Sequence, residues 1–249
     1  LKEDEVFAPL VPYYIVEIYF LQKEYQQVID YGPKILENAS EKRAPSIARY
    51  IGESYFRIKQ YAEALPYLEK FLNGTKNPSR DDSYLVGIVY YRAGDYAKAA
   101  PLLEKATAGE DTLSQNAYYN LADCYLKLDD KSKARNAFSM AAKYDYDPLI
   151  KEDALFNFAK ITYGMVYSPF NEAIDALNQY IKEYPNTPRT DEAYHYLTIA
   201  YTNTKNYKGA LEAVQQIKHP DATINAALQK VAYYRGLELF QNLNFQEAI

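Results

Sequence analysis

An aromatic side chain recurs along this 249-residue chain every 35 to 39 residues, and this period is the strongest constraint on the fold. Subtraction of residue numbers gives these intervals for the following seven positions, of which only the fourth is not aromatic: Tyr25, Tyr61, Tyr96, Lys131, Phe170, Tyr207 and Phe245. A period of this length indicates a stack of small repeated units, because one such unit cannot bury its apolar face alone and packs against its neighbours.

Two small residues keep a nearly fixed distance from the aromatic in each unit. The first generally lies nine positions before it: Val16, Gly52, Gly87, Ala122, Ala159 (eleven before), Thr198 and Gly236. The second lies three positions after it: Val28, Ala64, Ala99, Ala134, Ala173, Ala210 and Ala248. Apolar residues around both recur at helical steps and do not alternate as in a strand. Each unit is therefore predicted to be a hairpin, whose first and second helices approach closely at the small residues.

Two hairpins depart from the pattern in ways that predict local differences. The stretch "GDY" at 94–96 supplies a Gly and an Asp for the turn between helices, whereas "KLDDKS" at 127–132 lacks both Gly and aromatic, so a looser joint is expected there. The stretch "TYGMVYSPFNEA" at 162–173 carries two extra residues, which predicts a change of superhelical pitch near residue 165.

The pattern resembles the tetratricopeptide repeat, most closely in "YLVGIVYYRAGDYAKAAPLLEKA" at 84–106. The resemblance extends from about residue 9 to residue 249 and implies an all-α fold, a right-handed superhelix of antiparallel helix hairpins. The chain is expected to form one solenoid, divided as follows: 9–44, 45–79, 80–114, 115–151, 152–190, 191–228 and a half repeat at 229–249. The link at 182–197, "KEYPNTPRTDEAYHYL", is similar to those of bacterial cell-envelope members of the family.

The rest of the sequence gives little support for chemistry. The net charge is −5, so no basic stripe is available for nucleic acid. No apolar run approaches the roughly 18 to 20 residues that cross a bilayer. His195 and His219 have no partner at metal-ligand spacing, and Cys124 occupies a small-residue environment. No phosphate-binding glycine motif occurs. We therefore expect no enzymatic activity, no cofactor and no metal site.

The resemblance implies that partners bind along the concave side, which the first helices line. The inward positions lie three before, one after and four after the first small residue. They predict an aromatic groove with a mainly acidic N-terminal half, formed by Tyr13, Glu17, Phe20, Arg49, Glu53, Phe56, Tyr84, Ile88, Tyr91, Tyr119, Asp123, Phe156, Lys160 and His195. Tyrosine suits such a surface because it presents a rigid apolar ring and a hydroxyl.

These features predict a non-catalytic scaffold that binds an extended peptide or a helix of a partner protein along the groove. Two alternatives stay open: a carbohydrate- or peptidoglycan-binding module, since exposed tyrosine rings can stack on sugars, and an assembly role in which the last hairpin packs against a following domain or another copy. The chain opens without Met, at Leu1, and is interpreted as a piece of a longer protein. The link at 182–197 favours a periplasmic or outer-membrane-associated location over the cytoplasm.

Overall fold

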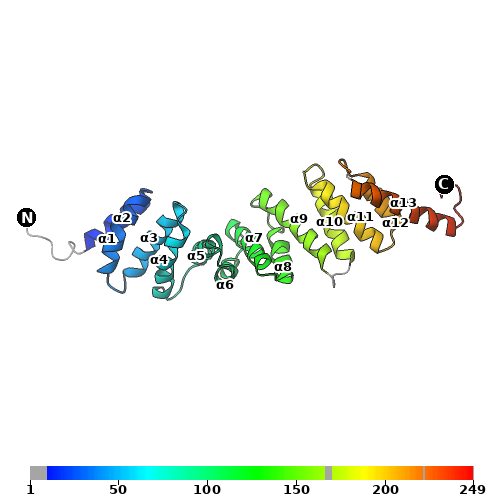
Figure 1. Ribbon diagram of the computed structural model, residues 1–249. Helices are drawn as coiled ribbons and strands as arrows, with labels where there is room; N and C mark the ends of the chain where they lie inside the picture. The colour runs from blue at the N-terminus through cyan, green and yellow to red at the C-terminus, as the bar shows by residue number, and fades with distance from the viewer. Residues whose placement is uncertain (1–9, 166–169, 221, 249) are drawn as a thin grey trace, which may run out of the picture. The chain divides into compact units, whose positions relative to one another are not determined.

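The computed structural model describes residues 10–165, 170–220 and 222–248, and within them the regular secondary structure is entirely helical (Figure 1). The helices in chain order are α1 (Val11–Leu21), α2 (Tyr25–Glu37), α3 (Ala44–Arg57), α4 (Tyr61–Gly74), α5 (Arg80–Ala93), α6 (Tyr96–Ala106), α7 (Thr112–Lys127), α8 (Lys131–Ala141), α9 (Pro148–Gly164), α10 (Phe170–Glu183), α11 (Thr190–Asn203), α12 (Tyr207–Gln215) and α13 (Ala222–Gln241). The prediction of an all-α, helical-repeat superhelix is confirmed.

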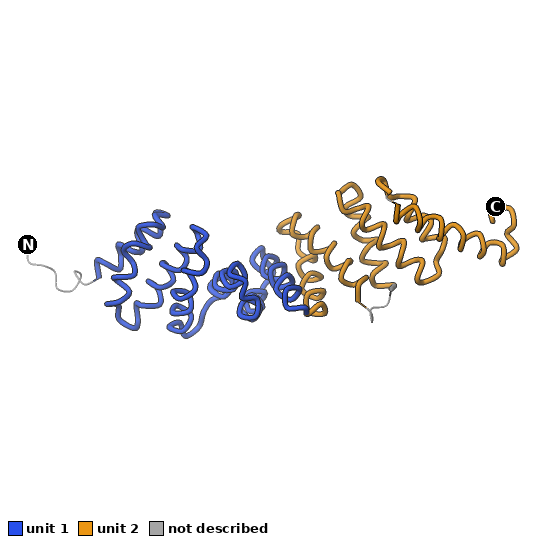
Figure 2. Tube along the Cα trace, in the orientation of Figure 1, with its two compact units in different colours: residues 1–129 blue, residues 130–249 orange. Residues whose placement is uncertain are grey.

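The chain divides into two compact units (Figure 2). Unit 1 is Leu1–Asp129 with helices α1 to α7, and unit 2 is Asp130–Ile249 with helices α8 to α13. Within each unit successive helices pack against each other, and first helices also contact the next first helix, as in α1 with α3, α5 with α7 and α9 with α11. Each hairpin therefore contacts only its neighbours, which is the packing of a repeat array.

The helix bounds define where each hairpin begins more closely than the ranges expected from the sequence. Helix α9 begins at Pro148 and α13 at Ala222, ahead of the expected starts at 152 and 229, because each is longer than the periodic segment used to place it. The expected pitch change near residue 165 borders residues 166–169, which lie outside the described residues.

The small residues lie where the helices of a hairpin meet. Val16, Ala64 and Ala99 are completely buried. A Cβ atom added to Gly52 would lie 2.6 Å from Leu68 Cγ and 3.2 Å from the carbonyl oxygen of Ala64. A side chain at this position would therefore require Leu68 or the adjacent backbone to shift. The predicted close approach is thus confirmed.

The turns of the described residues share one left-handed residue, two positions before the recurring aromatic or its equivalent. Gly94 fills this place with φ 85°, and the other turns use Lys23, Lys59, Asp129, Lys205 and Leu243, with φ between 57° and 65°. The residue after it can act as a helix cap: the Asp95 carboxylate accepts from the Lys98 amide at 3.1 Å. Asp129 adopts the same left-handed backbone conformation as the residues at this position in the other described turns. The turn at 127–132 therefore keeps this conformation without a glycine.

Candidate functional site

The predicted groove residues all lie on first helices, namely α1, α3, α5 and α7 in unit 1 and α9 and α11 in unit 2. Eleven of the fourteen are at least partly exposed: Tyr13, Glu17, Phe20, Arg49, Phe56, Tyr84, Tyr91, Tyr119, Asp123, Lys160 and His195. The other three are buried, with Glu53 7%, Ile88 6% and Phe156 4% exposed, so they do not offer a binding surface. Because neighbouring first helices pack together, some positions that face inward by helical period lose their exposure.

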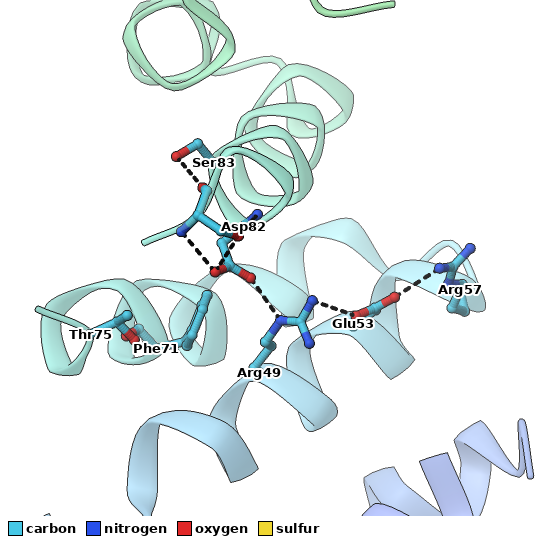
Figure 3. Close-up of polar contacts among 8 residues, drawn as sticks. Arg49, Glu53, Arg57, Phe71, Thr75, Asp82 and Ser83 are labelled. Atoms are coloured by element: carbon cyan, nitrogen blue, oxygen red, sulfur yellow. Dashed lines mark hydrogen bonds and ion pairs between the residues drawn. The ribbon is translucent and has the colours of Figure 1, made fainter. Parts of the chain in front are cut away.

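The charged pair Arg49 and Glu53 belongs to a network inside unit 1 (Figure 3). Arg49 Nε lies 3.0 Å from Asp82 Oδ1, and Arg57 Nη2 donates to Glu53 Oε1 at 2.8 Å. Asp82 also accepts from the Ser79 amide at 3.0 Å and closes the capping box of α5. The network ties α3 to the start of α5. The carboxylates of Glu53 and Asp82 are therefore paired with arginines of the same protein. The predicted groove thus carries less unpaired negative charge than its sequence suggests.

Two further acids bridge neighbouring first helices through tyrosine hydroxyls. Tyr50 on α3 donates to Glu17 Oε1 at 3.0 Å, and Tyr91 on α5 donates to Asp123 Oδ2 at 2.8 Å. Burial, reinforced in each case by the carboxylate partner, raises the pKa of Tyr50 to about 12 and the pKa of Tyr91 to about 12. Both tyrosines are thus held neutral, and the bridges join consecutive hairpins.

The predicted aromatic ladder is partly paired within itself. In three hairpins of unit 1 the aromatic four positions after the first small residue contacts the aromatic of the turn. The ring centroids are 6.2 Å apart for Phe20 and Tyr25, 5.9 Å for Phe56 and Tyr61, and 5.8 Å for Tyr91 and Tyr96. These rings close the hairpin ends, so only part of the ladder is available to a partner.

A hollow of about 270 Å³ in unit 1 contains two of the predicted groove residues, Tyr13 and Glu17. Its complete lining is Tyr13, Tyr14, Glu17, Lys42, Arg43, Ser46, Ile47 and Tyr50. The Arg43 guanidinium lies 5.0 Å from the centroid of the Tyr13 ring. Sequence reasoning missed Lys42, Arg43 and Ser46 because they lie in the link before α3 and in its first turn, outside the positions that keep register from repeat to repeat.

Unit 2 has a smaller polar cluster on its first helices. Lys160 on α9 donates to Glu192 Oε1 on α11 at 2.8 Å, and Tyr196 donates to the same oxygen at 2.8 Å. The bond to Glu192 raises the pKa of Lys160. The Tyr163 and Tyr196 rings lie 5.0 Å apart. The cluster therefore repeats in unit 2 the linkage of consecutive first helices found in unit 1.

The two histidines line a second hollow of about 270 Å³ beside α11, which the sequence did not predict. His195 and His219 meet there with Asp191 and Glu192. Asp191 accepts from the amides of Lys218 and His219 at 3.2 and 3.1 Å, which fixes this link to α11. No group of three or more His, Cys, Asp or Glu residues among the described ones could hold a metal ion.

Cys124 is completely buried within unit 1. Burial raises the pKa of its thiol to about 12. A thiol reacts as its thiolate, and this environment disfavours that form. The side chain therefore acts as a small apolar residue, as its sequence environment indicates.

Comparisons with known proteins identify the repeat. One family model, described as anaphase-promoting complex, cyclosome, subunit 3, matches residues 57–141, and the tetratricopeptide repeat model matches residues 153–187. No sequence among the curated proteins matches this chain. The solved structure of YrrB, described as a TPR protein with an unusual peptide-binding site, is 19% identical; the match covers 80% of this chain and 97% of YrrB with a TM-score of 0.58. A structure of MamA is 21% identical, with 73% and 96% covered and a TM-score of 0.51. No helix within the described ranges has the length and apolarity to cross a membrane.

Proposed function

Because this chain is a tetratricopeptide-repeat protein, a family of protein-interaction scaffolds that are typically not catalysts, we propose that it binds an extended peptide of a partner protein across the first helices of unit 1. The hollow between α1 and α3 is the anchor of this site. The groove positions at Tyr84, Tyr91 and Tyr119 extend the contact along the following helices. YrrB, which shares the fold, is described as having a peptide-binding site, and this supports a peptide as the ligand class.

The anchor is expected to take an acidic side chain of the peptide flanked by apolar residues. Lys42 and Arg43 have no ion-pair partner among the described residues, whereas the Glu17 carboxylate already accepts from Tyr50. The free charge of the hollow is therefore positive. The floor is apolar, because Ile47 is 3% exposed. A carboxylate paired with an apolar neighbour satisfies both features.

A sugar fits this hollow less well than a peptide. Stacking on a sugar ring requires a free tyrosine face, and the Tyr13 ring has the Arg43 guanidinium 5.0 Å from its centroid. A peptide carboxylate can bind that guanidinium without displacing it from the ring. The location in a bacterial envelope belongs to the same proposal and rests on the link at 182–197 alone.

The test is selection of a random peptide library on the immobilised protein, followed by measurement of affinity for the enriched peptides. We expect enrichment of peptides with Asp or Glu beside an apolar residue. Arg43→Glu should weaken their binding about 10-fold or more, since a hydrogen bond to a charged group contributes about 1.5–3 kcal/mol.

Lys230→Glu is the matched control for that measurement. Lys230 also lies over a tyrosine ring, 5.9 Å from the Tyr234 centroid, but it belongs to α13 in unit 2 and not to the proposed site. Binding should change little in this variant. Equal losses in the two variants, or a library that yields no acidic peptides, would contradict the proposed site.

A further inference from the structure

The hollow of about 270 Å³ beside α11 belongs to unit 2 and has no part in the peptide site proposed for unit 1. It lies between the start of α11, the link after α12 and the beginning of α13. Its complete lining is Asp191, Glu192, His195, Ile217, His219, Thr223 and Ile224. The hollow of unit 1 also lies between a first helix, the link that follows its hairpin and the next first helix. The two hollows can therefore be compared by the charges that line them.

The free charge in the hollow of unit 2 is negative, the reverse of that in unit 1. The Asp191 carboxylate accepts from the amide of Lys218 at 3.2 Å and from the amide of His219 at 3.1 Å, one on each oxygen. No cation forms an ion pair with Asp191 among the described residues. The ammonium of Lys218 donates instead to Asn186 Oδ1 at 3.2 Å. Asp191 is thus held in place by backbone amides, and its charge is not paired.

The second acid of the lining is already paired. Glu192 Oε1 accepts from Lys160 Nζ and from the Tyr196 hydroxyl, each at 2.8 Å. Asp191 is therefore the carboxylate of the hollow that a ligand can pair with.

The chain itself shows which group suits an aspartate near the start of a first helix. Three other such aspartates pair with an arginine: Asp82 with Arg49, Asp111 with Arg80, and Asp153 with Arg189. Asp191 lies in the first turn of α11, the next first helix, and has no arginine. The fold leaves open at Asp191 the place that a guanidinium fills at the other three.

The rest of the lining also suits an arginine side chain. Ile217 and Ile224 are each 8% exposed and give the hollow an apolar wall for the methylene groups. His195 and His219 add flat rings, and a guanidinium stacks on such rings better than an ammonium does. Each oxygen of Asp191 carries one amide hydrogen bond and retains acceptor capacity, so the carboxylate can still accept two parallel bonds from a guanidinium.

We propose that this hollow binds an arginine side chain from an extended segment of a partner protein, with the guanidinium on Asp191. The volume is below the roughly 300–1,000 Å³ of small-molecule sites, so the hollow holds one side chain. Free arginine fits less well, because it carries a carboxylate of its own and the lining contains no lysine or arginine to pair with it. The site has its own ligand chemistry and does not depend on the site in unit 1.

The experiment uses the two histidines as probes, because the chain contains no others and both line the hollow. Proton NMR follows their ring signals at constant pH while the capped tripeptide Ile-Arg-Ile is added to the unchanged protein. Both signals should shift and saturate together. The same tripeptide with citrulline in place of arginine keeps the shape but lacks the charge, and it should bind about 10-fold or more weakly. Free arginine should also bind more weakly than the tripeptide.

Asp191→Asn should weaken binding of the arginine tripeptide about 10-fold or more. Asp175→Asn is the matched control, since Asp175 is exposed on α10 and outside the hollow, and this variant should bind as the unchanged protein does. Arg43→Glu, which alters the hollow of unit 1, should also leave this binding unchanged. Circular dichroism compares the helicity of the three variants.

The comparison of the two tripeptides needs only the unchanged protein, so it decides the matter even if Asp191→Asn does not fold. Equal affinities for the arginine and citrulline tripeptides would overturn the proposal. Equal binding by folded Asp191→Asn and Asp175→Asn variants, free arginine that binds as tightly as the tripeptide, or histidine signals that do not shift would each overturn it as well.

Discussion

At the scale of single residues, the small side chains between helices are the most tightly constrained positions. Gly52 and Gly87 both face a leucine of the second helix, but the space differs. The nearest atom to an added Cβ is 2.6 Å away at Gly52 and 3.0 Å away at Gly87. The sequence has a small residue at both positions, but only the packing shows that the space at Gly52 is tighter than the space at Gly87.

Gly52→Ala should lower the free energy of unfolding by about 1–3 kcal/mol, the usual cost of overpacking. The cause is that the added methyl group meets both Leu68 and the backbone carbonyl of Ala64. Gly164→Ala is the control: an added Cβ there meets no atom of the described residues within 4 Å, so stability should be unchanged or slightly raised. Urea denaturation of the two variants checks the difference, and a Gly52→Ala variant as stable as the unchanged chain would refute the assigned contact.

The left-handed turn residues give a second prediction at this scale. Lys59 has φ 65°, a conformation that costs a residue with a Cβ about 1–2 kcal/mol. Lys59→Gly should raise stability by about 0.5–1 kcal/mol, because the relief of this strain exceeds the added entropy of the unfolded chain.

The reverse change at Gly94 should destabilise by a similar amount. Its φ is 85° and an added Cβ meets no atom within 4 Å, so Gly94→Ala tests conformation alone. Thermal unfolding of both variants measures the pair of effects. Shifts of the same sign in the two variants would show that backbone strain is not the cause.

At the scale of helices, polar bridges between first helices hold consecutive hairpins in place. Glu17 and Asp123 each accept from a tyrosine hydroxyl of the neighbouring first helix, Glu192 on α11 accepts from Lys160 on α9, and Arg49 joins α3 to α5. Several residues that the sequence predicted as partner-binding groups are therefore used inside the protein. Helical period identifies which face a residue occupies, but not whether a neighbouring helix reaches that face first.

The tyrosine bridges predict a pH dependence. The pKa of Tyr50 and that of Tyr91 are each raised to about 12, so the neutral form is favoured by folding. Their contribution to stability is complete below the ordinary tyrosine pKa of about 10 and is lost as the pH rises through about 12. The free energy of unfolding should therefore decrease as the pH rises from about 10 to about 12.

A variant with both Tyr50→Phe and Tyr91→Phe should show a shallower fall, because it lacks the two hydroxyls that ionise. Tyr233→Phe is the control, since Tyr233 is 64% exposed and its loss should leave the slope unchanged. Urea denaturation at a series of alkaline pH values measures these slopes. Identical slopes for the double variant and the control would contradict the role of the bridges.

At the scale of the whole molecule, a repeat array has interior and terminal hairpins that differ only in what covers them. Val11 and Ile18 of α1 are each 49% exposed, whereas their equivalents in the repeat, Ile47 of α3 and Val89 of α5, are 3% and 0% exposed. Packing between neighbouring hairpins therefore decides which of these equivalent positions are buried.

The sequence by itself determined the hairpins and the small residues at their close contacts, because these follow from a helical period that is local to the chain. Only the tertiary structure decided that Glu53, Ile88 and Phe156 are buried and that Lys42 and Arg43 line the hollow. The physical reason is that exposure depends on how neighbouring hairpins pack. Residues in the links, such as Lys42 and Arg43, have no repeat register from which their position in space could be read.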